Sequence, residues 1–158
     1  MSNFVKLANP QDILFFCFRK FFISFLISSC ILYAFYFLEL LNHDVSRTGS
    51  GSSVANVLFD TLIVPFIESI LLVMIISFFD IFLSMKKSAI ISGFVFASFH
   101  SMIEWVLGFV ILPLFIISAL SYQEAKNEKM KIRFAIVFLI HAFNNLLASA
   151  LDVAFLKV

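Results

Sequence analysis

Four polar side chains lie inside long hydrophobic runs of this sequence, where such groups are rare. Glu68, His100, His141 and Asn145 supply a carboxylate, two imidazoles and an amide. Groups of these kinds transfer protons, polarise water and donate hydrogen bonds to a developing negative charge. A central charge in a membrane helix costs about 2.5 to 3.5 kcal/mol, so such residues are retained mainly where they face a partner or a wet cavity. We therefore take these four residues as the candidate catalytic site.

The spacing of these residues predicts that they meet. His141 and Asn145 are four residues apart in the hydrophobic run 134–156, so a helix places them on one face. At a rise of about 1.5 Å per residue, Glu68, His100 and His141 lie roughly 12 to 18 Å from the cytoplasmic ends of their predicted helices. This shared depth predicts that three helices bring their polar groups together near the middle of a membrane.

The composition is that of a membrane protein. Of the 158 residues, 62% are hydrophobic, and 23 are Phe against only four Gly, which indicates a wide lipid-facing surface. The net charge of +1 offers no basic surface for a nucleic acid, so membrane lipid is the expected environment. Cys17 and Cys30 lack the spacing of a metal or redox pair and are interpreted as small hydrophobic residues.

The hydrophobic pattern predicts an all-α fold, a polytopic membrane helix bundle with about five transmembrane helices. Asn9 and Pro10 form a typical helix start, and the first complete span is expected after Arg19 and Lys20. The segment before Arg19 is expected either to lie in the membrane interface or to extend the helix. A turn is placed around Glu104, Trp105 and Gly108, between two short spans. The expected spans are Phe21 to Leu41, Val57 to Phe79, two within Ser88 to Ser121, and Phe134 to Leu156.

Charge placement orients these spans. With the N-terminus inside, nine of the eleven Lys and Arg residues fall on the cytoplasmic side and only Arg47 and Lys157 outside. The chain is therefore expected to be a multi-pass protein of the cell membrane with a cytoplasmic N-terminus and an outer C-terminus. We interpret residues 1–158 as a single membrane domain. Residues 1–56 form an anchor helix and a flexible Gly-Ser linker, and residues 57–158 form a four-helix core that carries the site.

Three short motifs give a family resemblance. Phe96-Ala-Ser-Phe-His100 and His141-Ala-Phe-Asn-Asn145 are similar to the second and third motifs of the CPBP family of intramembrane proteases, also called ABI. This family includes the type II CAAX prenyl endopeptidases and bacteriocin-processing proteins. Its first motif, a Glu-Glu pair shortly after Pro and ending in Arg, is partly present from Pro65 to Val73, with Glu68 at the first Glu. Ser69 replaces the second Glu and Val73 the Arg.

The resemblance implies a glutamic-type intramembrane endopeptidase that needs no cofactor. Glu68 would act as the general base, and His100 would hold and polarise the attacking water. His141 and Asn145 would stabilise the oxyanion. The substrate would be a membrane-associated peptide or protein, with a prenylated C-terminus, a leader peptide and a sorting tail all open.

Two other functions fit the same residues. Glu68, His100 and His141 offer a carboxylate and two imidazoles, a set of ligands that suits zinc, although no His-Glu-x-x-His spacing is present. The chain would then be a membrane metal-binding protein. Alternatively, Ser69 and Val73 indicate a catalytically inactive relative that acts as an immunity or scaffold protein in the membrane.

Overall fold

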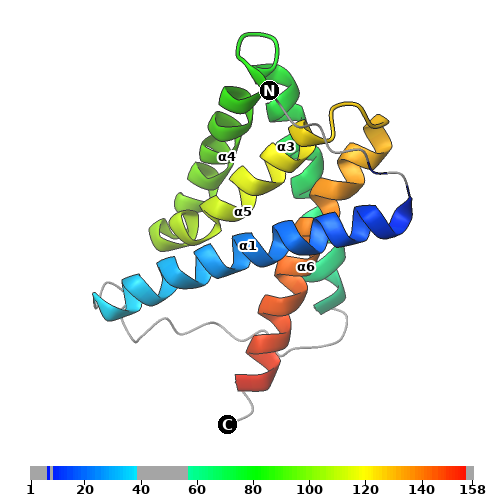
Figure 1. Cartoon of the computed structure of the whole chain (residues 1–158). Coiled ribbons are helices and arrows are strands. Elements are labelled where there is room, and N and C mark those ends of the chain that lie inside the picture. Colours follow the sequence, from blue (N-terminus) through cyan, green and yellow to red (C-terminus); the bar gives the residue numbers. More distant parts are fainter. Residues whose placement is uncertain (1–6, 8, 39–56, 156–158) are drawn as a thin grey trace.

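The computed structural model describes residue 7, residues 9–38 and residues 57–155, and this part of the chain contains helices and no strand. The all-α prediction is confirmed. In chain order the helices are α1 (Pro10–Phe37), the short π-helix η1 (Phe59–Ile63), α3 (Val64–Phe79), α4 (Met85–Ser101), α5 (Trp105–Glu124) and α6 (Met130–Phe155) (Figure 1). The predicted linker, residues 42–56, and with it the boundary at residue 56, lies outside the described residues.

The helices have the lengths and composition of a multi-pass membrane protein. The segments that are long and apolar enough to cross a membrane are Pro10–Phe37, Phe59–Phe79, Trp105–Glu124 and Met130–Leu151. Helix α4 has 17 residues, which at about 1.5 Å each reach roughly 26 Å. The membrane bundle therefore contains four helices of full spanning length and the shorter α4.

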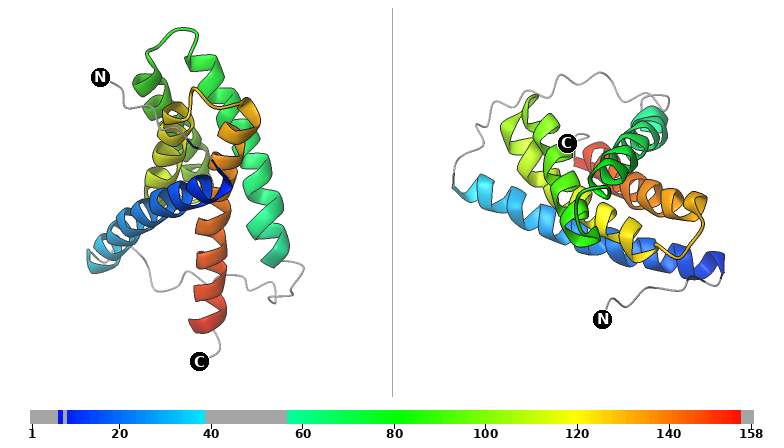
Figure 2. Two further views of the ribbon diagram at one scale, coloured as in Figure 1. Left: turned by 45° about the vertical axis from the view of Figure 1, so that its right-hand side comes forward. Right: turned by 90° about the horizontal axis from the view of Figure 1, so that it is seen from above.

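Helix α1 runs through the basic pair Arg19-Lys20, so the segment before Arg19 extends the helix, one of the two arrangements that the sequence left open. The Asn9 side chain caps its first turn by accepting a hydrogen bond from the Asp12 N–H at 2.9 Å, as the sequence predicts. Lys20, in the middle of the helix, forms an ion pair of 2.7 Å with Glu124 at the end of α5. Because the charge has a partner there, the helix continues through it and lies across α5 and α6 (Figures 1 and 2).

Helices α4 and α5 form a close hairpin, and here one sequence prediction is wrong. Gly108, assigned to the turn, lies inside α5, and the turn consists of residues 102–104. A Cβ atom at Gly108 would stand 2.8 Å from the Ala97 carbonyl oxygen, and one at Gly93 would stand 2.9 Å from the Ile116 Cα. Glycine is thus required for close helix approach rather than for a turn.

The main core lies where α3, α4 and α5 meet. Its fully or almost fully buried side chains include Leu72 and Ile76 from α3, Phe96 from α4, and Phe115 and Tyr122 from α5. Gln123 donates from Nε2 to both carboxylate oxygens of Asp80, at 2.7 and 2.9 Å, and so ties the end of α5 to the end of α3. This packing fixes the end of α4, which carries His100, against α3 and α5.

Candidate functional site

The Glu68 carboxylate lies between two imidazole rings that come from two other helices. Its Oε1 is 3.0 Å from Nε2 of His100 in α4, and its Oε2 is 3.0 Å from Nε2 of His141 in α6. Both distances are those of hydrogen bonds. Three of the four residues predicted from the sequence therefore meet at one carboxylate; we call Glu68, His100 and His141 the acid–imidazole cluster.

His100 is held by the end of its own helix. It is the residue before Ser101, where α4 ends, and its Nδ1 lies 3.1 Å from the Phe96 carbonyl oxygen. The Phe96 carbonyl lies one turn earlier in the same helix, so the imidazole bonds back to its own helix, as side chains four residues apart can do. Since a carbonyl only accepts, Nδ1 carries a hydrogen. The contact between His100 Nε2 and Glu68 Oε1 then contains one proton, held by either atom.

The cluster lies at different positions along its three helices. Glu68 and His141 are near the middle of 57–79 and of α6, respectively, whereas His100 is near the C-terminal end of α4. In consequence α6 and the segment formed by η1 and α3 continue past the turn between α4 and α5 (Figures 1 and 2). The sequence predicted a similar membrane depth for the three groups and a turn shortly after His100, and His100 does lie near the end of its helix.

This position leaves the cluster partly accessible. The Glu68 and His100 side chains are 20% and 19% exposed, whereas that of His141 is 5% exposed. Each carboxylate oxygen can accept a further hydrogen bond besides the one it shares with an imidazole. Glu68 and His100 thus form the exposed part of the cluster, while His141 supports the carboxylate from the buried side.

Phe115 of α5 packs against both histidines. Its ring centroid is 5.2 Å from that of His100 and 5.3 Å from that of His141, and the residue is 1% exposed. Phe96 closes the same wall, 4.5 Å from Phe115 and 5.5 Å from His100. These rings restrict how the imidazoles can turn. Sequence reasoning missed Phe115, because nothing in the local pattern separates it from the other 22 Phe residues.

Asn145 makes a different contact. Its side chain donates from Nδ2 to the backbone carbonyl of Asp60, in η1, at 2.9 Å. It lies one turn after His141 on α6, so it shares that face of the helix but is directed to η1 rather than to the carboxylate. The structure thus brings together three of the four predicted residues and places the fourth on a neighbouring backbone group.

The two positions that depart from the family motif are buried. Ser69 is fully buried, and among the described residues its hydroxyl has no hydrogen-bond partner. Val73 is 8% exposed and belongs to the main core. A guanidinium at position 73 would lie among the apolar side chains of the main core, and a carboxylate at position 69 would be fully buried. The chain therefore holds Glu68 with imidazoles alone, without further charged side chains from α3.

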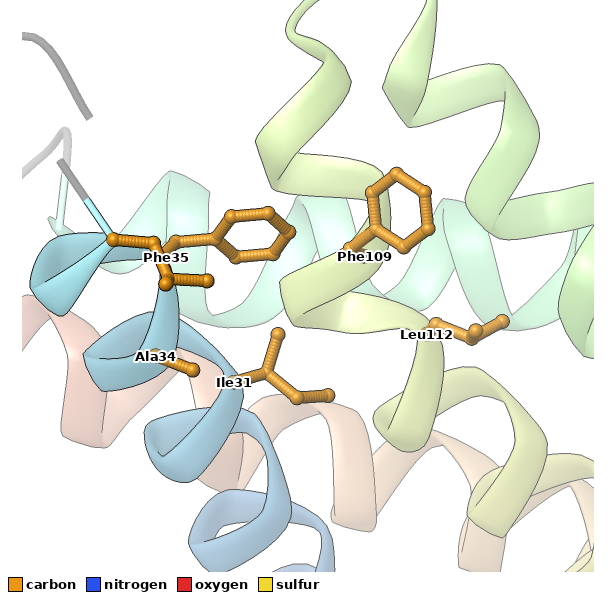
Figure 3. A pocket seen from close by; sticks show the side chains of 6 residues that line it. Ile31, Ala34, Phe35, Phe109 and Leu112 are labelled. Carbon is orange, nitrogen blue, oxygen red and sulfur yellow. The ribbon is translucent and has the colours of Figure 1, made fainter. Parts of the chain in front are cut away.

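The described residues contain no cluster arranged as a metal site, and a cavity between two helices is apolar. Within residues 7, 9–38 and 57–155, no group of three or more His, Cys, Asp and Glu side chains is arranged to hold a metal ion. A cavity of about 300 Å³ lies between α1 and α5 (Figure 3). This cavity offers no acid–base group, because all its lining side chains are apolar. They are Ile31, Ala34, Phe35, Leu38, Phe109 and Leu112.

Comparisons of the chain with family models, with curated proteins and with solved structures find no match. The resemblance described above therefore stays a prediction, and the case for a function is carried by the acid–imidazole cluster itself.

Proposed function

We propose that this protein is an intramembrane endopeptidase that hydrolyses a membrane-associated peptide or protein with a water molecule activated by Glu68 and His100. The observation that carries the proposal is the carboxylate of Glu68 at 3.0 Å from two imidazoles supplied by separate helices. Such a group is costly in a membrane helix and is expected where it performs chemistry. The partial exposure of the Glu68 and His100 side chains supports the proposal that water has access to them.

The proposed reaction uses the groups of the cluster in sequence. Glu68 takes a proton from water while His100, bonded through Nε2 to Oε1, holds the carboxylate against that water, and the water oxygen attacks the peptide carbonyl carbon. The carbonyl oxygen becomes negatively charged and is stabilised by a donor such as the N–H of His141. The proton then passes from Glu68 to the peptide nitrogen as the C–N bond breaks, which leaves a free carboxylate and a free amine.

A second function is favoured by Ser69 and Val73. Because both are buried where the family motif has charged residues, the chain is also a candidate for a non-catalytic membrane protein that kept the helix core. An immunity or scaffold protein would need the acid–imidazole cluster only to hold three helices together. The two functions differ in whether the purified protein cleaves anything.

Cleavage can be sought without knowing the substrate. The full chain is purified, reconstituted in lipid vesicles and incubated with the solubilised membrane proteins of an expression host. New N-termini are then mapped by mass spectrometry against a Glu68→Gln preparation. We expect a set of cleavage sites that depends on Glu68. Identical sets of termini in both preparations would favour the non-catalytic function.

Activity is expected to persist without a bound metal ion. The two Nε2 atoms face carboxylate oxygens at hydrogen-bond distance, an arrangement that serves proton transfer directly. Initial rates should therefore be unchanged within about twofold after dialysis against EDTA or 1,10-phenanthroline. Loss of cleavage on chelation, with recovery on adding zinc, would instead support a zinc site at Glu68, His100 and His141.

The proposed orientation is testable by labelling. With the native Cys17 and Cys30 replaced by alanine, a cysteine is introduced for Ser50 or for Lys129. The charge distribution predicts that a membrane-impermeant maleimide labels position 50 in intact cells and position 129 only after permeabilisation. Labelling of both positions from the same side would contradict an odd number of crossings between them.

A further inference from the structure

The π-helix η1 leaves one backbone carbonyl without a partner from its own helix. The N–H of Val64 donates to the Phe59 carbonyl, five residues earlier, rather than to Asp60, four residues earlier. The next residue is Pro65, which has no N–H to donate. Neither of the two donors that a helix offers to the Asp60 carbonyl therefore reaches it.

Asn145 fills this gap from another helix. Its Nδ2 donates to the Asp60 carbonyl oxygen at 2.9 Å. In a membrane an unsatisfied backbone carbonyl is strongly unfavourable, because no solvent donor replaces the missing one. The side chain of α6 thus supplies the hydrogen bond that the combination of a π-helix and a proline removes.

The same two helices meet again one turn away along α6 and two turns away along η1 and α3. Glu68 lies eight residues, about two turns, after Asp60, and His141 lies four residues, about one turn, before Asn145. Their contact, Glu68 Oε2 to His141 Nε2 at 3.0 Å, joins the segment of η1 and α3 to α6 a second time. The bond between Asn145 and Asp60 is therefore placed to fix the register in which Glu68 faces His141.

We propose that Asn145 is a positioning residue, which sets the place of Glu68 by holding the unpaired carbonyl of the π-helix. Its effect on turnover rests on the proposed peptidase function, whereas its effect on the helix register does not. An Asn that donated directly to the oxyanion would need its amide at the substrate, and removal of Pro65 would not replace it. Pro65 therefore offers a test that separates the two.

The test is a double-mutant cycle. Asn145→Ala, Pro65→Ala and the double variant are compared with the wild type in melting temperature, kcat and KM, with Asn144→Ala as the matched control on the neighbouring face of α6. Replacing Pro65 restores an N–H at that position, which gives the Asp60 carbonyl a donor within its own helix. If Pro65→Ala does not fold, Pro65→Ser restores the same N–H.

We expect Asn145→Ala to lower the melting temperature by about 2–4 °C, as the loss of one hydrogen bond does in a chain of this size. It should lower kcat by up to about 10²-fold with KM little changed, because Glu68 is displaced. In the Pro65→Ala background both losses should largely vanish. Asn144→Ala should leave both quantities close to those of the wild type.

Two results would overturn the proposal. An equal loss of kcat in both backgrounds would assign Asn145 to the substrate itself, and an unchanged melting temperature in Asn145→Ala would show that the carbonyl does not depend on it. If the wild type cleaves nothing, the melting temperatures alone complete the cycle. The absence of cleavage would count against the peptidase function, whereas the melting temperatures would still test whether Asn145 holds the Asp60 carbonyl.

Discussion

Replacing Glu68 by glutamine should abolish turnover while the helix bundle stays folded. Glutamine keeps the shape of the side chain and can still exchange hydrogen bonds with His100 and His141, but its amide cannot take a proton from water. General-base catalysis contributes about 10²- to 10⁴-fold, so kcat should fall by at least that range. Initial rates in vesicles and the melting temperature are measured on the same preparation.

The matched control is Glu104→Gln. It makes the same chemical change at an exposed glutamate in the turn that follows α4, four residues from His100. This variant should retain the wild-type rate and stability. If Glu104→Gln lowers kcat as much as Glu68→Gln does, the effect belongs to charge near the membrane boundary and not to a base at position 68.

His100→Gln is expected to have the second largest effect. The new amide can still approach Oε1 of Glu68, but it cannot carry a proton between that carboxylate and a water molecule. We expect kcat to fall by about 10²- to 10⁴-fold, with KM little changed, because the proton is in motion only in the transition state. Rate and affinity are separated by full saturation curves.

Ser98→Ala provides the control for this variant. Ser98 is exposed near the end of the same helix, and its hydroxyl bonds only to the Phe94 carbonyl at 2.8 Å among the described contacts. It should behave as the wild type. If the loss of stability in His100→Gln accounts for its whole loss of rate, His100 is a packing residue between α3 and α5 and takes no part in catalysis.

Much of the helical fold could be predicted because its signals are local. Hydrophobic runs predict the helices, and Asn9 before Pro10 predicts the start of α1. The meeting of Glu68, His100 and His141 was also predictable, since buried ionisable groups in a membrane chain need one another. The sequence could not decide whether α1 continues through Lys20, because the partner of Lys20, Glu124, is 104 residues away in the sequence. A charged residue whose partner is unknown is easily interpreted as the boundary of a membrane helix.

Other features of the site depend on how the helices pack and could not be predicted. Phe115 gains its place beside two histidines only from the close hairpin of α4 and α5. The contact of Asn145 with Asp60 requires the π-helix, which shifts one backbone hydrogen bond by one residue. Sequence periodicity does not resolve such a shift, because the five residues of η1 are too few to establish a period of their own.

The central claim is that Glu68 activates a water molecule. The most direct measurement is a single turnover in water labelled with ¹⁸O, with the enzyme in excess over a peptide identified by the mapping of new termini. If water attacks the substrate, the new carboxylate carries one ¹⁸O atom from the first turnover, and Glu68→Gln yields no product. A first-turnover product without ¹⁸O would show that an enzyme group, rather than water, attacks the peptide carbonyl, and would contradict the mechanism.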